Sequence, residues 1–84
     1  MMAAPNAPLP AIFFTGDVKA QVVPWVEGIT LAQALIAAQY TGFWDPHTIT
    51  VTRNGIPYTV NVKKFLRGEE NPELEAGDNV QVRH

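Results

Sequence analysis

Residues 48–62 read Thr-Ile-Thr-Val-Thr-Arg-Asn-Gly-Ile-Pro-Tyr-Thr-Val-Asn-Val, and this stretch decides the fold class. Polar and apolar residues alternate on both sides of Asn54-Gly55, which is the period of a half-buried strand. An Asn-Gly pair favours a two-residue type I′ turn, because both turn positions need a positive φ. The stretch therefore predicts a β-hairpin of residues 48–53 and 56–62, with its threonines facing water or a partner. The side chains expected to face a helix are Ile49, Val51, Ile56, Tyr58, Val60 and Val62.

A helix is predicted before this hairpin. Thr30 and Gln33 fit a capping box, in which each side chain satisfies a backbone N–H group at the start of the helix. Apolar residues then recur with the spacing of one helical face, at Leu31, Ala34, Leu35 and Ala38. The helix is expected to end near Gln39. Because this face is narrow and rich in alanine, the helix can lie close against a sheet.

Two strands are predicted in front of the helix. Residues 12–18 and 21–26 are rich in β-branched and aromatic side chains, which favour strands. Lys19-Ala20 is expected to form the turn between them. Pro24 has no N–H group to give to a neighbouring strand, so the second strand is expected at a sheet edge or a bulge.

Three further elements are predicted after the hairpin. Residues 63–67 favour a short helical turn, residues 69–78 an acidic loop, and residues 79–83 a last strand. The side chains that these segments are expected to bury are Phe65, Leu66, Leu74, Val80 and Val82. The order is strand, strand, helix, strand, strand, short helix, strand. This order is that of a β-grasp (ubiquitin-like) domain, an α+β fold in which a mixed sheet holds one main helix.

The 84 residues are enough for one small domain. Residues 1–10 contain three of the seven prolines and no charge, which predicts a flexible tail before a domain at residues 11–84. The tail has neither the basic start nor the apolar run of a secretory signal. No apolar stretch approaches the ~20 residues of a membrane helix. We therefore expect no direct membrane insertion, and the sequence leaves the compartment open.

The chain has no cysteine, which excludes disulfides, thiolate metal sites and catalytic thiols. Its net charge of −2 gives no reason to expect nucleic-acid binding. His47, in Asp45-Pro46-His47, is interpreted as a turn residue, and His84 ends the chain, where fraying is expected. A zinc site needs three or four protein ligands, which these residues do not supply. The sequence thus predicts no catalytic residue, cofactor or metal.

Most charged side chains are interpreted as ordinary surface charge. The carboxylates of residues 69–78 do not have the spacing of an EF-hand loop. Asp78, which follows Gly77, is predicted to stabilise a turn before the last strand. The basic group consists of Arg53, Lys63, Lys64 and Arg67. Pairing of this group with the acidic loop of the same or a neighbouring copy stays open as an alternative.

Aromatic residues are the best candidates for a contact surface. Aromatic faces stack on sugar rings and on flat ligands, and exposed aromatic patches often mark partner surfaces. The alternative is that a small domain needs these large side chains to complete its core, which is the interpretation preferred for Phe43. The predicted ligand-binding or partner-binding residues are Trp25, Tyr40 and Trp44.

Several segments, taken in order, resemble a known family. They are IFFTGDV at residues 12–18, EGITLAQAL at 27–35, DPHTITVTRNG at 45–55, FLRG at 65–68 and NPELEAGDNV at 71–80. From Ile12 to Arg83 the chain resembles the SLBB domain, the soluble-ligand-binding β-grasp of bacterial polysaccharide export proteins. Two places depart from the family pattern: Lys19-Ala20 stands where a Pro-Gly turn is usual, and residues 39–42 replace a small, Gly-rich segment.

The resemblance implies a β-grasp domain without catalytic residues. Such a domain contacts a polysaccharide or a protein partner in assemblies of the cell envelope. It also implies a periplasmic location, although this chain carries no signal peptide. No ligand-binding residue is carried over from the family.

Two alternatives stay open. The first is a ubiquitin-like carrier of the sulfur-transfer type, which needs an activated C-terminal Gly-Gly, whereas this sequence ends in Gln81-Val82-Arg83-His84. The second is a structural domain that forms homo-oligomers, with the edge strand at Pro24 pairing with another copy.

Overall fold

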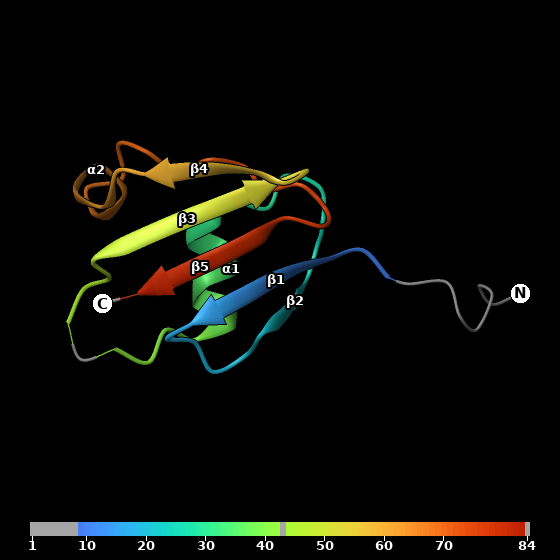
Figure 1. Ribbon diagram of the computed structural model, residues 1–84, viewed down its shortest axis with the longest axis horizontal. Coiled ribbons are helices and arrows are strands. Elements are labelled where there is room, and N and C mark those ends of the chain that lie inside the picture. Colours follow the sequence, from blue (N-terminus) through green and yellow to red (C-terminus); the bar gives the residue numbers. More distant parts are fainter. Residues whose placement is uncertain (1–8, 43, 84) are drawn as a thin grey trace, which may run out of the picture.

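The computed structural model describes residues 9–42 and 44–83, which form a five-stranded sheet and two helices (Figure 1). The elements are β1 (Ala11–Gly16), β2 (Val22–Pro24), α1 (Leu31–Ala38), β3 (Thr48–Arg53), β4 (Ile56–Val60), α2 (Val62–Leu66) and β5 (Asn79–Arg83). The strand order is β2-β1-β5-β3-β4. β1 and β5 are parallel, and the other neighbours are antiparallel. The predicted α+β class, element order and mixed sheet are confirmed.

Three predictions fall on residues outside this description: the tail at residues 1–8, the place of Phe43 in the core, and the fraying of His84. Within the described residues, the strands at Thr48–Arg53 and Asn79–Arg83 have the predicted bounds, and the ends of the other strands and of the short helix differ from the predicted ones by at most two residues.

The hydrophobic core lies between the sheet and α1, which crosses behind β3, β5 and β1 (Figure 1). Alternate residues of the strands point inward, as the period of two requires. The buried core side chains are Ile12, Phe14, Val23, Ile29, Leu31, Ala34, Ala38, Ile49, Val51, Val60, Leu74, Val80 and Val82. The predicted burial of Leu74, Val80 and Val82 is therefore confirmed.

Helix α1 begins and ends as predicted. The Thr30 hydroxyl accepts a hydrogen bond from the Gln33 N–H (3.4 Å), and the Thr30 N–H donates to the Gln33 side chain (3.0 Å). Gln39 ends the helix in the left-handed region, with φ of 59°. Ala34 and Ala38 are buried, and Leu35 is half-buried. The two small side chains let α1 approach the sheet closely.

The predicted turn at Lys19-Ala20 is wrong. β2 has only three residues, and the segment that joins it to β1 turns toward α1. The N–H groups of Lys19 and Ala20 donate to the Ala38 carbonyl at 3.0 and 2.9 Å, and Val18 forms a β-bridge with Tyr40. The last carbonyls of a helix have no partner within it, so the segment satisfies the C-terminal end of α1.

The hairpin of β3 and β4 has the predicted type I′ turn, with φ of 52° at Asn54 and 78° at Gly55. Its register places Ile56, Tyr58 and Val60 on the same face as Ile49 and Val51. Only Val60 of these three is covered, whereas Ile56 is 70% and Tyr58 48% exposed. The prediction that both face the helix is wrong, because α1 does not extend beneath the turn end of β4 (Figure 1).

Helix α2 starts earlier than expected. The Asn61 side chain accepts a hydrogen bond from the Lys64 N–H (3.1 Å), so Val62 belongs to the helix and not to the strand. Phe65 is half-buried against the core, but Leu66 is 48% exposed, which corrects the prediction that both are buried. A helix of five residues offers one narrow face to the core, and Phe65 occupies it. Neither described helix is long and apolar enough to cross a membrane.

The two edge strands each carry a proline, as predicted for Pro24. Trp25 N–H donates to Pro10 O (3.0 Å) and Phe14 N–H to Gln21 O (2.8 Å), so the nitrogen of Pro24 faces away from β1. In β4 the turn register gives Pro57 the same outward position. A proline has no N–H group, so both edges lack a donor that an added strand would need.

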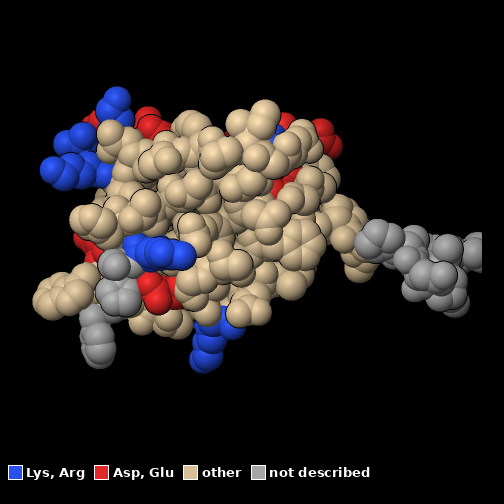
Figure 2. All heavy atoms as spheres, in the orientation of Figure 1, with Lys and Arg blue, Asp and Glu red and all other residues tan. Residues whose placement is uncertain are grey.

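The outer face of the sheet carries few charges (Figure 2). The threonines of β3 lie on this face, since they alternate with the buried Ile49 and Val51. Their predicted position toward water or a partner is confirmed.

We predict that Gly16→Ala destabilises the domain by more than about 3 kcal/mol. A Cβ at this position, where φ is +98°, would collide with the Val82 carbonyl oxygen in the parallel β1–β5 pair. Gly68→Ala is the matched control, because Gly68 has φ of +77° and nothing within 4 Å of the new Cβ. It should cost about 1 kcal/mol for the left-handed backbone alone. Equal losses in urea unfolding would contradict the collision.

Candidate functional site

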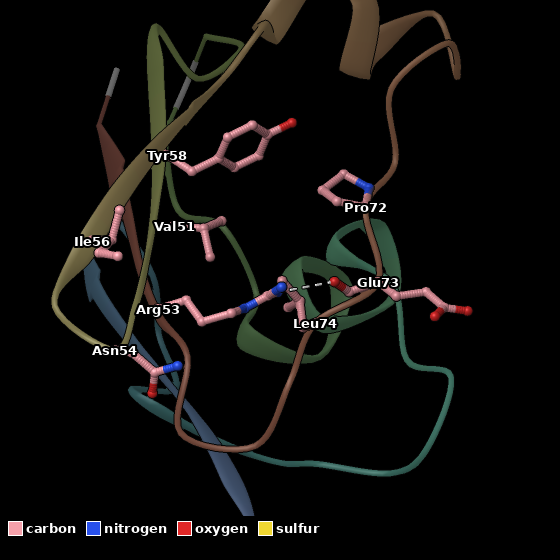
Figure 3. A pocket seen from close by; sticks show the side chains of 8 residues that line it. All are labelled: Val51, Arg53, Asn54, Ile56, Tyr58, Pro72, Glu73 and Leu74. Atoms are coloured by element: carbon pink, nitrogen blue, oxygen red, sulfur yellow. Dashed lines mark hydrogen bonds between the residues drawn. The ribbon is translucent and has the colours of Figure 1, made fainter.

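The most distinct concave site is a hollow of about 430 Å³ between the β3–β4 hairpin and the chain at residues 72–74 (Figure 3). We call it the hairpin hollow. It is lined by Val51, Arg53, Asn54, Ile56, Tyr58, Pro72, Glu73 and Leu74. Its volume falls in the range of small-ligand sites, and most of its lining is apolar.

One wall of the hollow is fixed to the start of α1. Leu31 N–H donates to Pro72 O (2.8 Å), Leu74 N–H donates to Ile29 O (2.9 Å), and Ala32 N–H donates to the Asn71 side chain (2.9 Å). These bonds hold residues 71–74 away from β4. The side chains of Ile56 and Tyr58 form the opposite wall and remain uncovered (Figure 3). The hollow thus exists because residues 71–74 are bonded to the start of α1, whereas β4 is bonded to β3.

Arg53 crosses the floor of the hollow toward Asp78. Its Nε donates to Asp78 Oδ1 at 3.0 Å and its Nη2 to Asp78 Oδ2 at 2.8 Å, a bidentate pair. Its Nη2 also donates to Glu73 O (3.2 Å, Figure 3), and its Nη1 lies 3.2 Å from Glu75 Oε2. The hydrogen bond to Asp78 raises the pKa of Arg53 above its ordinary value, and the charges of Asp78 and Glu75 add to this effect.

Asp78 is the one buried charged residue among those described, with 1% of its surface exposed. Besides Arg53, its Oδ2 accepts a hydrogen bond from the Glu75 N–H (2.8 Å), which confirms the predicted turn before the last strand. The preferred interpretation of Arg53 as ordinary surface charge is wrong, because its guanidinium binds the buried Asp78 carboxylate. The alternative, pairing with the acidic loop of the same chain, is confirmed for Arg53.

The charge around the hollow is negative on balance. The guanidinium of Arg53 pairs with the carboxylates of Glu75 and Asp78, and Glu73, which also lines the hollow, adds a third carboxylate nearby. Most of the guanidinium N–H groups are engaged, so little remains to hold an anion. The negative balance makes the hollow unfavourable for an acidic ligand.

Tyr58 is held in place at the rim. Its hydroxyl donates to Glu70 Oε2 (3.0 Å), which also accepts from the Asn61 N–H (3.1 Å). The hydrogen bond to Glu70 raises the pKa of Tyr58, because the bond needs the protonated hydroxyl. The ring therefore keeps one orientation and offers a face to the hollow (Figure 3).

Of the three aromatic residues predicted as a contact surface, Tyr40 and Trp44 lie together and Trp25 lies apart from them. Trp25 is half-buried, and its Nε1 donates to Leu74 O (2.8 Å) near the start of α1. Tyr40 lies beyond the other end of α1, a helix about 12 Å long, and its hydroxyl donates to Trp44 O (2.6 Å). Burial raises the pKa of Tyr40, and the charges of Asp17 and Asp45 raise it further. Trp44 is 77% exposed.

The sequence reasoning missed the hollow. Ile56 and Tyr58 follow the alternation of a core-facing strand, and nothing in that pattern marks where the helix stops covering it. One feature of the sequence did bear on the hollow. Leu74 was predicted to be buried, which fixes the loop at residues 69–78 beside the hairpin, where it can form one side of a hollow. The sequence left pairing of Arg53 with the acidic loop open, but no local pattern marked Asp78 as its partner.

The comparisons with known proteins give no family. The chain matches no protein-family model, and no curated protein matches it. Among the described residues, no group of three or more His, Asp or Glu side chains could hold a metal ion. Function is therefore argued from the geometry of the hollow and from the resemblance in the sequence.

We predict that Arg53→Met destabilises the domain by about 2–4 kcal/mol, because it leaves the buried Asp78 carboxylate without its cation. Arg67→Met is the matched control, since the Arg67–Glu69 pair is exposed on both sides, and it should cost less than about 1 kcal/mol. Urea unfolding measures both. If Asp78→Asn costs as much in the Arg53→Met background as in the unmodified chain, the two side chains are not coupled.

A second prediction concerns alkaline pH. The pKa values of Tyr40 and Tyr58 are both raised by folding, so the protonated hydroxyls stabilise the folded state. This stabilisation is fully present below the ordinary tyrosine pKa of about 10 and is lost as pH rises through the folded-state values. Tyrosinate absorbance should therefore have a higher midpoint in the folded protein than in urea. Tyr58→Phe and Tyr40→Phe assign the two groups, and equal midpoints in folded and unfolded chains would contradict the prediction.

Proposed function

We propose that this chain is a β-grasp module of the SLBB type, a binding domain without catalytic activity that uses the hairpin hollow as its ligand site. The strand order β2-β1-β5-β3-β4, the parallel pair in its middle and the single main helix on one face support the β-grasp assignment. The ordered segments between Ile12 and Arg83 support the SLBB resemblance. The resemblance implies work in polysaccharide export or cell-envelope assembly.

The observation that carries the binding function is the hollow itself. It is open, mostly apolar and close to 430 Å³, with one wall hydrogen-bonded to α1 and its floor fixed by the Arg53–Asp78 pair. A cavity held open by its own framework does not need to be ordered when a ligand binds, which lowers the cost of binding. Its lining offers contact area and a few fixed polar groups, an arrangement that serves recognition.

The ligand that fits best is a neutral glycan segment. The Tyr58 ring can stack on a sugar ring, Ile56 adds apolar contact, and the Asn54 side chain at the turn can hydrogen-bond hydroxyl groups. The surplus of carboxylates around Arg53 disfavours uronic or sialic acids. We therefore expect neutral oligosaccharides to bind and acidic ones of equal length not to bind.

A second glycan site is favoured by one observation, the 77% exposure of the Trp44 indole beside Tyr40. Self-association through a sheet edge has less support, because Pro24 and Pro57 each remove an outward-facing donor. The sulfur-carrier alternative has no support beyond the shared β-grasp order of elements.

An amide NMR titration with neutral and acidic oligosaccharides tests the proposal. Saturable shifts at residues 53–58 and 72–74 with the neutral sugar alone are expected. Ile56→Ala and Tyr58→Ala should each weaken binding by about 3- to 10-fold without unfolding the domain, since both side chains are exposed.

Trp44→Ala is the control, because its indole lies away from the hollow residues and its loss should leave the affinity unchanged. Shifts confined to the Trp44 indole, with affinity lost in Trp44→Ala, would move the site to the second candidate. No saturable shift at millimolar sugar would reject glycan binding at both places.

A further inference from the structure

Helix α1 has an unusual surface for a helix that faces solvent. Its eight residues, Leu-Ala-Gln-Ala-Leu-Ile-Ala-Ala, include no charge, and Gln33 is its only polar side chain. One side is buried in the core, while Ile36 on the other side is 77% exposed. A helix with one face in water normally places charged or polar residues there, and a helix that is apolar all round is normally covered.

A groove lies between this exposed side and α2. Its volume is about 430 Å³, and its apolar walls come from Leu35 and Ile36 of α1, Phe65 and Leu66 of α2, and the Tyr40 side chain. Leu66 is 48% exposed in it. The groove is separate from the hairpin hollow and shares no lining residue with it.

Positive charge lies at the α2 side of the groove. Lys63 precedes Leu66 by three positions, so the two side chains are neighbours on one face of α2. Lys63 and Lys64 make no ion pair with the described residues, whereas Arg67 is paired with Glu69 at 3.2 Å. Basic side chains project at the end of the molecule where α2 lies (Figure 2). Lys63 therefore places an unpaired cation beside the apolar groove, and Lys64 adds positive charge elsewhere on the same short helix.

We propose that the groove binds an amphipathic helix of another protein, with apolar side chains facing Ile36 and Leu66 and acidic side chains facing Lys63. The walls of the groove are helices whose backbone groups bond within themselves, so they offer no edge to an added strand. The incoming segment must satisfy its own backbone hydrogen bonds, which a helix does. The partner's charge follows from the two lysines.

A second copy of this chain is a poor occupant. In a symmetric contact between two grooves, each copy would bring its own Lys63 and Lys64, and α1 has no carboxylate to receive them. The groove thus fits a different chain. This site goes beyond the glycan-binding proposal and does not depend on it.

The test uses a displayed library of random peptides of roughly 16 residues, about four helical turns, selected on the whole 84-residue protein. We expect enriched peptides to repeat apolar residues at i, i+3 or i+4, and i+7, with Asp or Glu beside them. Ile36→Gln should weaken the best peptide by at least about tenfold. Lys63→Glu with Lys64→Glu should weaken it similarly, and more at low salt.

Val26→Gln is the matched control, because Val26 is an exposed apolar residue (60%) that does not line the groove. Circular dichroism checks that every variant is folded, and the sugar titration should be unchanged in Ile36→Gln. The proposal is overturned if no peptide is enriched, if enriched peptides bind Ile36→Gln as well as Val26→Gln, or if they are basic. It is also overturned if light scattering shows a dimer that Ile36→Gln dissociates.

Discussion

A buried carboxylate must be paired, and in this domain that constraint falls on Asp78. Its side chain holds Arg53 of β3 through two hydrogen bonds and the Glu75 N–H through a third. Its backbone carbonyl accepts from the Phe13 N–H of β1 at 2.9 Å. One residue thus connects β1, β3 and the loop that leads into β5. Because the strands that it joins form the middle of the sheet, the core and the hairpin hollow both depend on this pairing.

The edges and one face of the sheet are blocked or covered, and this determines which surfaces remain for binding. Both edges carry a proline whose nitrogen points outward, and the N–H group of Asn61, next to β4, is already taken by Glu70. One face of the sheet is covered by α1, and the other carries few charges (Figure 2). What remains concave is the turn end of β4, where α1 no longer reaches, and the groove between α1 and α2. The hollow at the turn end of β4 arises because α1 is too short to cover the whole β3–β4 hairpin.

Sequence reasoning succeeded where a few neighbouring residues decide the structure. The capping box of Thr30 and Gln33 and the turn at Asn54-Gly55 each depend on side chains at most three positions apart. It failed where the deciding partner is distant. Ile56 and Tyr58 have the pattern of core residues, and their exposure depends on the length of a helix that starts 25 positions before Ile56. The N–H groups of Lys19 and Ala20 likewise donate to the carbonyl of Ala38, at the far end of α1, and no local pattern indicates this contact.

The charges show the same difference between neighbours in the chain and partners that are distant in it. Along the chain, Arg53 belongs to the only basic group, together with Lys63, Lys64 and Arg67. In three dimensions Asp78 and Glu75 neutralise Arg53, and Glu69 pairs with Arg67, so the unpaired positive charge of this group is confined to the two lysines of α2. Glu73 and Glu75 leave the hollow negative. The two concave surfaces therefore differ in charge, and an acidic partner suited to the groove is disfavoured at the hollow. A domain with this separation can hold a neutral ligand and an acidic partner at the same time without competition between them.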